Sequence, residues 1–316
     1  MDSLAAERRI RDYVRETSLK ASPALGAETG ARVFLKRENC QDTGAFKLRG
    51  AANKLLSMPR DAAARGVVTA STGNHALAVA TMGARLGIPV EIFVSQAIHP
   101  YKRRKIEALE AKVTSVAGDH LAAELEARRE AERSGRPYVS PYNDPDVIAG
   151  QGTVAVEILR QLGGEPLDAI FVAVGGGGLI GGIGAHLKRV SPGTEVVGCW
   201  PENSPVLHEC LRAGTIIDVP EKPTWSTSTA GGVEPGAVTF ELCQRVIDRS
   251  VLVTEGEIVG AARRLHCEDG ELVEGAAAMA VAAFLRIADA YHGKTVALLL
   301  CGGNAEPEFE AKILEN

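Results

Sequence analysis

The sequence predicts an α/β protein with parallel, doubly wound sheets, and two features of the chain support this prediction. Short runs of β-branched residues alternate with helical patterns along nearly all of the 316 residues. The run at 169–174 lacks polar alternation, as expected for a strand that is covered on both faces in a parallel sheet. Ligands of such sheets bind outside the carboxyl ends of the strands, so the loops that follow strands are the first candidates for a site.

The alternation can be assigned to residue ranges in chain order. Runs of β-branched residues mark the strands, and apolar residues at three- and four-residue spacing mark the helices. The helix at 101–111 is basic and amphipathic, and the charged helix at 121–134 is expected to be solvated on most of its surface. The expected strands are 31–36, 66–70, 90–94, 113–116, 169–174, 196–200 and 295–300. The expected helices are 45–58, 74–86, 101–111, 121–134 and 148–162.

Composition limits the class of protein. A hydrophobic share of 45% and a charged share of 24% are ordinary for a globular protein, and the length predicts one large or two medium domains. A net charge of -5 without long charged runs offers no basic face for nucleic acid. The six cysteines form no C-x-x-C pair, and no apolar stretch of about 18 residues occurs. We therefore expect a cytoplasmic protein without a membrane span, a signal peptide, a disulfide scaffold or a zinc site.

Lys47 is the most informative single residue. It lies in the segment Thr43-Gly44-Ala45-Phe46-Lys47-Leu48-Arg49-Gly50, at the expected start of a helix. Apolar neighbours can hold the ammonium away from water, lower its pKa from about 10.4 and free its lone pair for attack on a carbonyl. Lysine is also common on exposed helices, so this interpretation depends on three loops that accompany it.

Two of these loops offer polar groups at strand ends. The segment Ser71-Thr72-Gly73-Asn74-His75 brings hydroxyls and backbone amides to a helix N-terminus, which suits a carboxylate. The simpler alternative is an N-cap by Ser71 or Thr72, with His75 as a structural hydrogen-bonding residue. The segment Cys301-Gly302-Gly303-Asn304 contains a cysteine that is either a small apolar core residue or a weak hydrogen-bonding partner for an aromatic ring nitrogen.

The third loop contains four consecutive glycines. Gly176-Gly177-Gly178-Leu179-Ile180-Gly181 satisfies G-x-G-x-x-G after a strand, and Glu202 follows at a distance suited to a ribose contact. A dinucleotide site is therefore one interpretation. The physical requirement is only that bare backbone amides at a helix N-terminus hold a phosphate, so any phosphorylated cofactor would fit.

Together these motifs resemble fold-type II pyridoxal-phosphate enzymes (tryptophan synthase β-like), the family of the threonine/serine dehydratases and serine racemases. Order and spacing agree over nearly the whole chain. The resemblance implies two doubly wound α/β domains, with a large PLP-binding domain from 1–55 and 143–316 and a small domain from 56–142. The matching segments are Phe46-Lys47-Leu48-Arg49-Gly50-Ala51, Ser71-Thr72-Gly73-Asn74-His75, Ile148-Ala149-Gly150-Gln151-Gly152-Thr153, the glycines at 175–178 and Cys301-Gly302-Gly303-Asn304.

The resemblance also implies roles for single residues. Lys47 would carry pyridoxal 5'-phosphate (PLP) as a Schiff base and would then take the proton from the substrate Cα. A neutral Cys301 at the ring nitrogen would favour prompt β-elimination. The other implied cofactor contacts are Phe46 on one ring face, Asn74 at the ring hydroxyl with Asn143 as a helper, and Gly175, Gly176, Gly177 and Gly178 at the phosphate. The implied substrate contacts are Ser71, Thr72, Gly73, Asn74 and His75.

Two departures from the family pattern bear on the reaction. Serine racemases carry a second serine in the carboxylate loop as the base on the opposite ring face, and this chain has Thr72 there, on a stiffer branched carbon. Family members with a structural divalent cation place acidic ligands in a loop that corresponds to 224–236, which has no carboxylate before Glu234. We therefore expect no metal of the family kind, with Glu202 or Glu274 as the remaining candidate ligands.

The implied function is a PLP-dependent dehydratase (ammonia-lyase) that converts a β-hydroxy-L-amino acid to a 2-oxo acid and ammonia. An amino-acid racemase of the same family is one alternative. A second is a dehydrogenase that binds NAD at the Gly176 loop. L-Threonine, L-serine, 3-hydroxyaspartate, phenylserine and a hydroxyectoine-derived amino acid are all open as substrates. The expected partners are a small amino acid and a second copy of the chain, because dimers are the commonest soluble oligomers.

Overall fold

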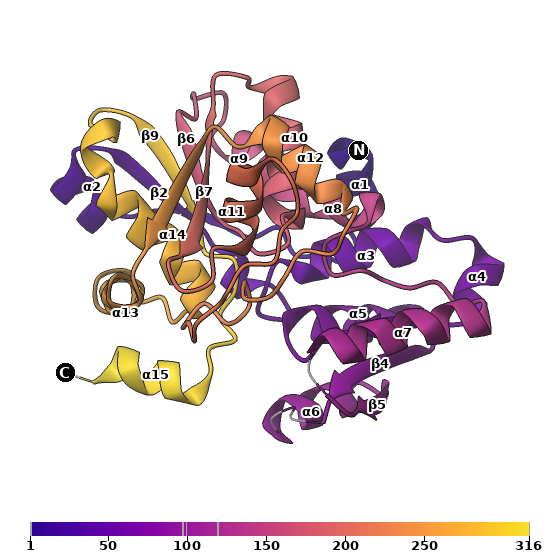
Figure 1. Cartoon of the computed structure of the whole chain (residues 1–316). Helices are drawn as coiled ribbons and strands as arrows, with labels where there is room; N and C mark the ends of the chain where they lie inside the picture. The colour runs from indigo at the N-terminus through magenta and orange to yellow at the C-terminus, as the bar shows by residue number, and fades with distance from the viewer. Residues whose placement is uncertain (1, 97, 99, 119, 316) are drawn as a thin grey trace.

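Two β-sheets form the framework of the computed structural model, which describes residues 2–96, 98, 100–118 and 120–315 (Figure 1). The larger sheet has the order β1-β2-β9-β6-β7-β8, and the smaller has the order β3-β4-β5. All pairs of neighbouring strands are parallel except β1 with β2. The strands are β1 (Leu19–Ala21), β2 (Arg32–Lys36), β3 (Val67–Ala70), β4 (Val90–Ser95), β5 (Lys112–Val116), β6 (Ala169–Ala173), β7 (Glu195–Pro201), β8 (Arg249–Val253) and β9 (Thr295–Leu299).

Helices occupy most of the connections between strands. Those of the first half are α1 (Ser3–Ile10), α2 (Pro23–Thr29), α3 (Lys47–Ser57), α4 (Arg60–Ala64), α5 (Asn74–Leu86), α6 (Pro100–Glu107), α7 (His120–Ser134), α8 (Pro145–Gln151) and α9 (Thr153–Gln161). Those of the second half are α10 (Gly178–Val190), α11 (Val206–Ala213), α12 (Val238–Val246), α13 (Glu255–Arg264), α14 (Gly275–Arg286) and α15 (Pro307–Leu314).

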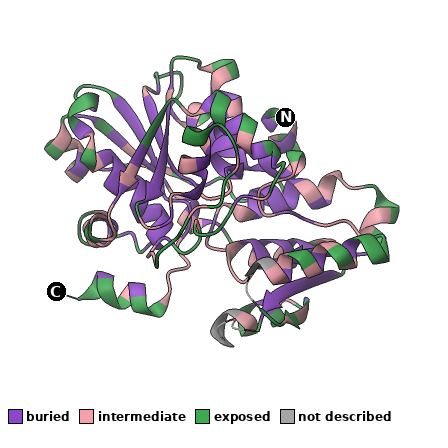
Figure 2. Ribbon diagram, viewed as in Figure 1, coloured by how far each residue is buried: buried purple, intermediate pink, exposed green. Residues whose placement is uncertain are grey.

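The larger sheet is buried between two layers of helices. Strands β6 and β9 are buried at every position, as expected for central strands of a parallel sheet. The connection from β6 to β7 runs through α10, whereas the connection from β8 back to β9 runs through α13 and α14. Because these connections advance in opposite directions across the sheet, the right-handed rule puts α10 and α14 on opposite faces. The purple core of Figure 2 fills the space between these layers.

The smaller sheet has its own apolar core. Helices α5 and α7 pack on β3 and β4, and α5 also packs on α3. Helix α3 in turn packs on α8, which lies beside α10 of the larger unit. The helix that begins at Lys47 is therefore in contact with elements of both sheets, as Figure 1 shows.

The α/β class and the parallel sheets predicted from the sequence are confirmed. All seven expected strands are present, each within one residue of its expected ends. The short antiparallel β1 and the edge strand β8 were not expected, because neither has a long β-branched run. The expected helix at 101–111 ends earlier, at Glu107, before a turn in which Glu110 has a φ of 59°.

The prediction of a single helix at 148–162 is wrong. The structure divides it at Gly152 into α8 and α9. The hydroxyl of Thr153 donates to the carbonyl of Gly150 (2.7 Å), a local bond that competes with the regular helical pattern. A Cβ on Gly152 would lie only 2.7 Å from the carbonyl oxygen of Gly182 in α10. The break thus coincides with a close backbone contact that apolar periodicity does not report.

Within the described part of the chain, no helix is long and apolar enough to cross a membrane.

Candidate active site

Lys47 is the first residue of α3, and the loop after β9 pairs with the segment that leads into this helix. The amide of Phe46 donates to the carbonyl of Cys301 (3.0 Å), and the amide of Gly303 donates to the carbonyl of Gly44 (2.8 Å). No side chain caps the helix, because its N-cap position is occupied by Phe46. The start of α3 is therefore held by the strand-end loop, which brings Cys301 to Lys47.

The Lys47 ammonium lies among groups that remove it from bulk water. Its Nζ donates to the carbonyl of Pro141 (2.7 Å) and lies 5.2 Å from the centroid of the Phe46 ring. Loss of hydration lowers the pKa of Lys47 from 10.5 to about 8, although nearby Cys301 and Glu274 oppose the shift. A lysine with this pKa has a much larger neutral fraction near pH 7 than an exposed one.

The polar loop after β3 leads directly into α5, which begins at Asn74. The hydroxyl of Ser71 accepts from the amide of Gly73 (3.2 Å), so this side chain shapes the loop together with neighbouring Thr72. No atom lies within 4 Å of the position that a Cβ on Gly73 would take, so there is free space beside this backbone. The His75 ring is buried and bonded to the carbonyl of Val139 (3.0 Å), and burial lowers its pKa to about 3.

The glycine loop follows β6 and opens α10. Gly177, the N-cap, has a φ of 84°, which an L side chain rarely adopts. A Cβ on Gly176 would come within 2.5 Å of the Tyr142 ring, and one on Gly178 would lie 3.0 Å from the Tyr142 backbone. A Cβ on Gly175 would lie 3.0 Å from the backbone of Thr229. The loop therefore has no room for side chains, and its amides at the N-terminus of α10 form a cradle suited to a phosphate.

Glu274, the N-cap residue of α14, is the main residue of this region for which no role in binding cofactor or substrate is predicted from the sequence. It is 7% exposed. Its carboxylate accepts from the side-chain amide Nδ2 of Asn74 (2.9 Å) and the Ser228 hydroxyl (2.7 Å), and the Asn304 side chain donates to Oδ1 of Asn74 (2.8 Å). An acidic residue immediately before a helix that begins with small, uncharged residues was the available signal, because a carboxylate is stabilised at a helix N-terminus.

Asn143 and Tyr142 lie in the segment between α7 and α8. The Asn143 side chain accepts from the amide of Val238 (2.8 Å), so it faces the start of α12. The Tyr142 hydroxyl accepts from the amide of Glu234 (3.0 Å), and its ring lies against Gly176. Tyr142 was missed in the sequence because an isolated tyrosine in a loop carries no periodic signal.

The carboxylates considered as metal ligands lie in other contacts. Glu202 pairs with Arg286 (3.1 Å), Glu234 pairs with Arg128, and Glu274 accepts from Asn74 and Ser228. Among the residues that the structure describes, no three His, Cys, Asp or Glu side chains are grouped so that they could hold a metal ion.

Close backbone contacts explain the Ile148-Ala149-Gly150-Gln151-Gly152-Thr153 motif. A Cβ on Gly150 would lie 2.5 Å from the carbonyl oxygen of Arg49 in α3. A Cβ on Gly182 in α10 would lie 2.2 Å from the carbonyl oxygen of Ile148. Helix α8 is therefore packed against both the lysine-bearing helix and the helix that follows the glycine loop, and it sets their separation.

A lysine with a lowered pKa, a glycine cradle at a helix N-terminus and a buried cysteine at the end of the neighbouring strand define a class: the fold-type II PLP enzymes. Comparison with known proteins supports the same class. The family model described as "Pyridoxal-phosphate dependent enzyme" matches residues 10–302. The chain belongs to this family, and PLP is its cofactor.

Several individual proteins are similar to this chain over most of its length. The chain is 38% identical to the L-threonine ammonia-lyase of Thermotoga maritima over 313 residues, which cover 99% of the chain and 77% of the relative. A similar relation holds for the L-threonine ammonia-lyase of Geobacter sulfurreducens, at 38% identity over 98% of the chain and 76% of the relative. Processed threonine deaminase isoform 2 of Solanum lycopersicum superposes with a TM-score of 0.93 at 30% identity, covering 99% and 91% of the two chains. Maize serine racemase superposes with a TM-score of 0.90 at 29% identity, covering 96% and 94%.

Family membership decides between the two interpretations of the glycine loop. The dehydrogenase alternative rested on G-x-G-x-x-G and on the spacing to Glu202, and the family identifies the phosphorylated cofactor as PLP instead of NAD. The described residues fit this group, since bare amides lie at the N-terminus of α10 and the pKa of Lys47 is lowered to about 8.

Proposed function

We propose that this enzyme is an ammonia-lyase (dehydratase) that converts a β-hydroxy-L-amino acid, such as L-threonine or L-serine, to a 2-oxo acid and ammonia. The observation that carries the proposal is Lys47, whose pKa is lowered to about 8 next to Cys301 in a member of the PLP family. Relatives at 34–38% identity over most of the chain have the names L-threonine ammonia-lyase or L-threonine dehydratase.

In this proposal four sets of residues would hold PLP. The amides of Gly175, Gly176, Gly177 and Gly178 would bind the phosphate, and Phe46 would pack on one ring face. Cys301 would meet the ring nitrogen as a neutral thiol, because burial raises its pKa well above the ordinary value. The Asn74 side-chain amide would meet the ring hydroxyl, since its orientation is fixed by Glu274 and Asn304.

The substrate carboxylate is assigned to the loop of Ser71, Thr72 and Gly73, where free space lies beside the Gly73 backbone and α5 begins. When PLP is bound, it supplies an electron sink for the pair left at Cα after deprotonation. Lys47 Nζ takes that proton, since its lowered pKa increases the neutral fraction available near pH 7. The Asn143 side chain is hydrogen-bonded to the backbone of Val238, and the His75 ring to the backbone of Val139. We therefore assign both residues supporting roles in shaping the site.

The racemase of the same family is the second candidate, since maize and Dictyostelium discoideum serine racemases superpose with TM-scores of 0.90. The residue that distinguishes the candidates is Thr72. We expect the chain to release oxo acid faster than it inverts serine, and chiral analysis of residual L-serine measures both rates. Inversion that exceeds elimination would favour the racemase, and Thr72→Ser shows whether the branched side chain is the cause.

The experiment that tests the proposal is 2-oxo acid release from a panel of β-hydroxy amino acids in both enantiomers. The panel includes threonine, serine, 3-hydroxyaspartate and phenylserine. Release from an L-substrate is expected, and it identifies the side chain that the enzyme accepts. No release from any member, with the Schiff-base absorption band present, would overturn the dehydratase proposal.

We also propose that the enzyme is a cytoplasmic homodimer with a large domain at 1–55 and 143–316 and a small one at 56–142. All six cysteines are free thiols, which supports a reducing compartment. The two separate sheets and their separate apolar cores support the two domains. Light scattering of the purified protein tests the dimer, and limited proteolysis near residues 56 and 142 tests the boundaries.

A further inference from the structure

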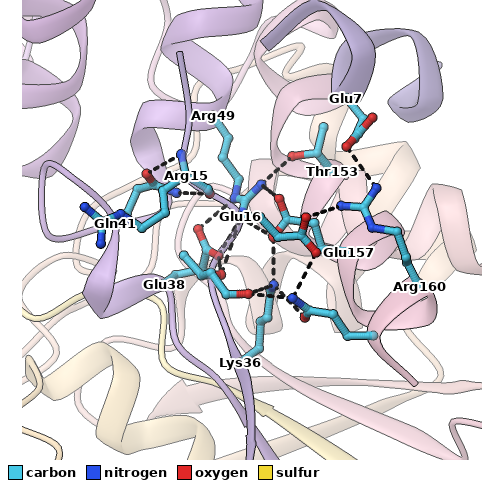
Figure 3. Close-up of polar contacts among 12 residues, drawn as sticks. Glu7, Arg15, Glu16, Lys36, Glu38, Gln41, Arg49, Thr153, Glu157 and Arg160 are labelled. Atoms are coloured by element: carbon cyan, nitrogen blue, oxygen red, sulfur yellow. Dashed lines mark hydrogen bonds and ion pairs between the residues drawn. The ribbon is translucent and has the colours of Figure 1, made fainter. Parts of the chain in front are cut away.

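Four charged side chains are completely buried behind the helix that begins at Lys47. Lys36 at the end of β2, Glu38 in the following 3₁₀ turn (Glu38–Cys40), Arg49 in α3 and Glu157 in α9 are each 0% exposed. Figure 3 shows them converging beneath α3. We call these four residues the buried quartet. It contains two cations and two carboxylates, so its formal charge is balanced.

Arg49 is the centre of the quartet because all its donors are used. Nε and Nη2 donate to the two oxygens of Glu38 (2.7 and 2.8 Å). Nη1 and Nη2 donate to the two oxygens of Glu157 (2.8 and 2.7 Å). The remaining Nη1 donor goes to the hydroxyl of Thr153 (3.1 Å). Such a planar fork fixes direction as well as distance, and a lysine cannot reproduce it.

Lys36 also belongs to the buried quartet, but it bonds to a different set of partners. Its Nζ donates to Glu157 (2.7 Å), to the carbonyl of Thr17 (2.7 Å) and to Gln161 (3.1 Å), with no hydrogen bond to α3. Removing Lys36 therefore unbalances the buried charge but leaves both bidentate contacts of Arg49. This difference supplies a matched control.

Burial of ion pairs is a weak source of stability, because desolvation offsets most of the attraction between the charges. The buried quartet instead fixes the relative positions of the elements that carry its residues. Glu38 follows β2 directly, and Glu157 belongs to α9, which leads into β6 and the glycine loop. Arg49 thus ties the first turn of α3 to the sheet on which the phosphate cradle is built.

The position of Arg49 on α3 connects the quartet to the active site. Lys47 and Arg49 are two residues apart, about 200° around the helix axis, so their side chains leave α3 in nearly opposite directions. Lys47 itself makes few contacts: the bond from Nζ to Pro141 and the Phe46 ring. In the first turn of α3, the side-chain hydrogen bonds that can oppose rotation of the helix are therefore concentrated on Arg49.

We propose that Arg49, held by Glu38 and Glu157, is a positioning residue that fixes the rotation of α3 at which the Lys47 ammonium faces the cofactor site. This inference rests on the proposed function only through the role of Lys47 as the Schiff-base residue. It does not depend on which amino acid is the substrate.

The test compares Arg49→Lys with Lys36→Met. The melting temperature and kcat apart from KM are measured in the PLP-loaded enzyme, and the rate at which added PLP forms the Schiff-base band is measured in stripped protein. Arg49→Lys keeps the charge and loses the fork, so we expect a fold-retaining variant in which band formation and kcat fall roughly 10- to 100-fold. Lys36→Met is expected to lower the melting temperature while band formation stays within about twofold of the wild type.

A purely structural role predicts another pattern. If both variants slow band formation in proportion to their loss of melting temperature, or if Arg49→Lys forms the band at the wild-type rate, the positioning role is overturned. Should Lys36→Met not fold, Arg11→Ala replaces it, since Arg11 reaches Glu157 from the surface (2.8 Å). A wild-type protein that forms the band without releasing oxo acid would overturn the proposed reaction, and the Arg49 comparison would still decide the positioning role. A wild-type protein without the band would overturn both.

Discussion

Lys47 and Arg49 are two cations of one helix, two residues apart, and the protein treats them in opposite ways. Burial disfavours the charged form of both. For Arg49 the carboxylates of Glu38 and Glu157 outweigh this effect and raise its pKa above the ordinary value. Lys47 has no carboxylate within ion-pair distance in the described structure, and its pKa falls to about 8.

The difference teaches that pairing decides what a cation withdrawn from water can do. A cation whose donors all meet acceptors is locked in its charged form and can only hold position. A cation bonded to a neutral carbonyl loses its proton more readily and can act as a nucleophile or a base. The chain places one of each kind on opposite sides of α3.

Removing the reactive cation should have the largest effect. Lys47→Ala is expected to lower kcat by roughly 10³-fold or more and to abolish the Schiff-base band, because both the covalent attachment and the base are lost. The melting temperature of the stripped protein should not fall, since the lysine was held at a cost in hydration. Absorbance spectra and oxo acid assays check this, and Lys105→Ala on α6 is the control. Wild-type-like turnover in Lys47→Ala would remove the mechanism.

Breaking the ion pairs of the buried quartet should have the next largest effect, and acid breaks them by protonating Glu157. Burial alone would raise the pKa of Glu157, but Arg49 and Lys36 outweigh it and hold the pKa at about 2, below the ordinary 4.5. The stabilisation is therefore complete above pH 4.5 and is lost as pH falls towards 2, on the order of 3 kcal/mol. Urea unfolding between pH 5.5 and 2 measures it. Glu157→Gln should flatten the dependence, and an unchanged slope in that variant would contradict the assignment.

The Lys47 side of α3 should respond to alkali: stability again rises with pH, but here because a penalty on the buried ammonium is removed. In the stripped protein the folded pKa of about 8 lies below 10.5, so the folded state binds fewer protons than the unfolded state between these values. Stability should therefore gain a contribution from Lys47 as pH rises from about 8 to 10.5, whereas the full penalty applies below pH 8. Comparing urea unfolding of wild type and Lys47→Met across this range isolates the contribution. Parallel curves for the two proteins would contradict it.

The smallest expected effect comes from removing the negative charge of Glu274 near Lys47. It tests how far a neighbouring charge influences the pKa of this lysine. Glu274 favours the protonated form of Lys47, so Glu274→Gln should move the pKa of Lys47 somewhat below 8. The pH dependence of PLP band formation in stripped protein reports this shift. Glu271→Gln is the control, because Glu271 is also buried but pairs with Arg37 (2.6 Å). A shift of equal size in both variants would show that the effect is not local to Glu274.

Much of the fold was predictable from the chain. Seven strands were assigned within one residue because parallel strands buried on both faces leave uninterrupted apolar runs in the sequence. The elements that were missed, such as β1, have short or mixed patterns. The break at Gly152 was missed because its cause is a backbone contact with Gly182, in another helix.

The sequence by itself determined the fold class and, through the resemblance of its motifs to known enzymes, the PLP family. It also marked the segments that we propose for the site, because their chemistry is local, as for a lysine between apolar residues or four glycines after a strand. Only the tertiary structure decided which buried groups are paired. Arg49 meets Glu157 across 108 positions of sequence, and Asn74 meets Glu274 across 200. Charge partners and loss of hydration depend on segments that folding brings together, so no local pattern could assign opposite behaviour to two cations on one helix.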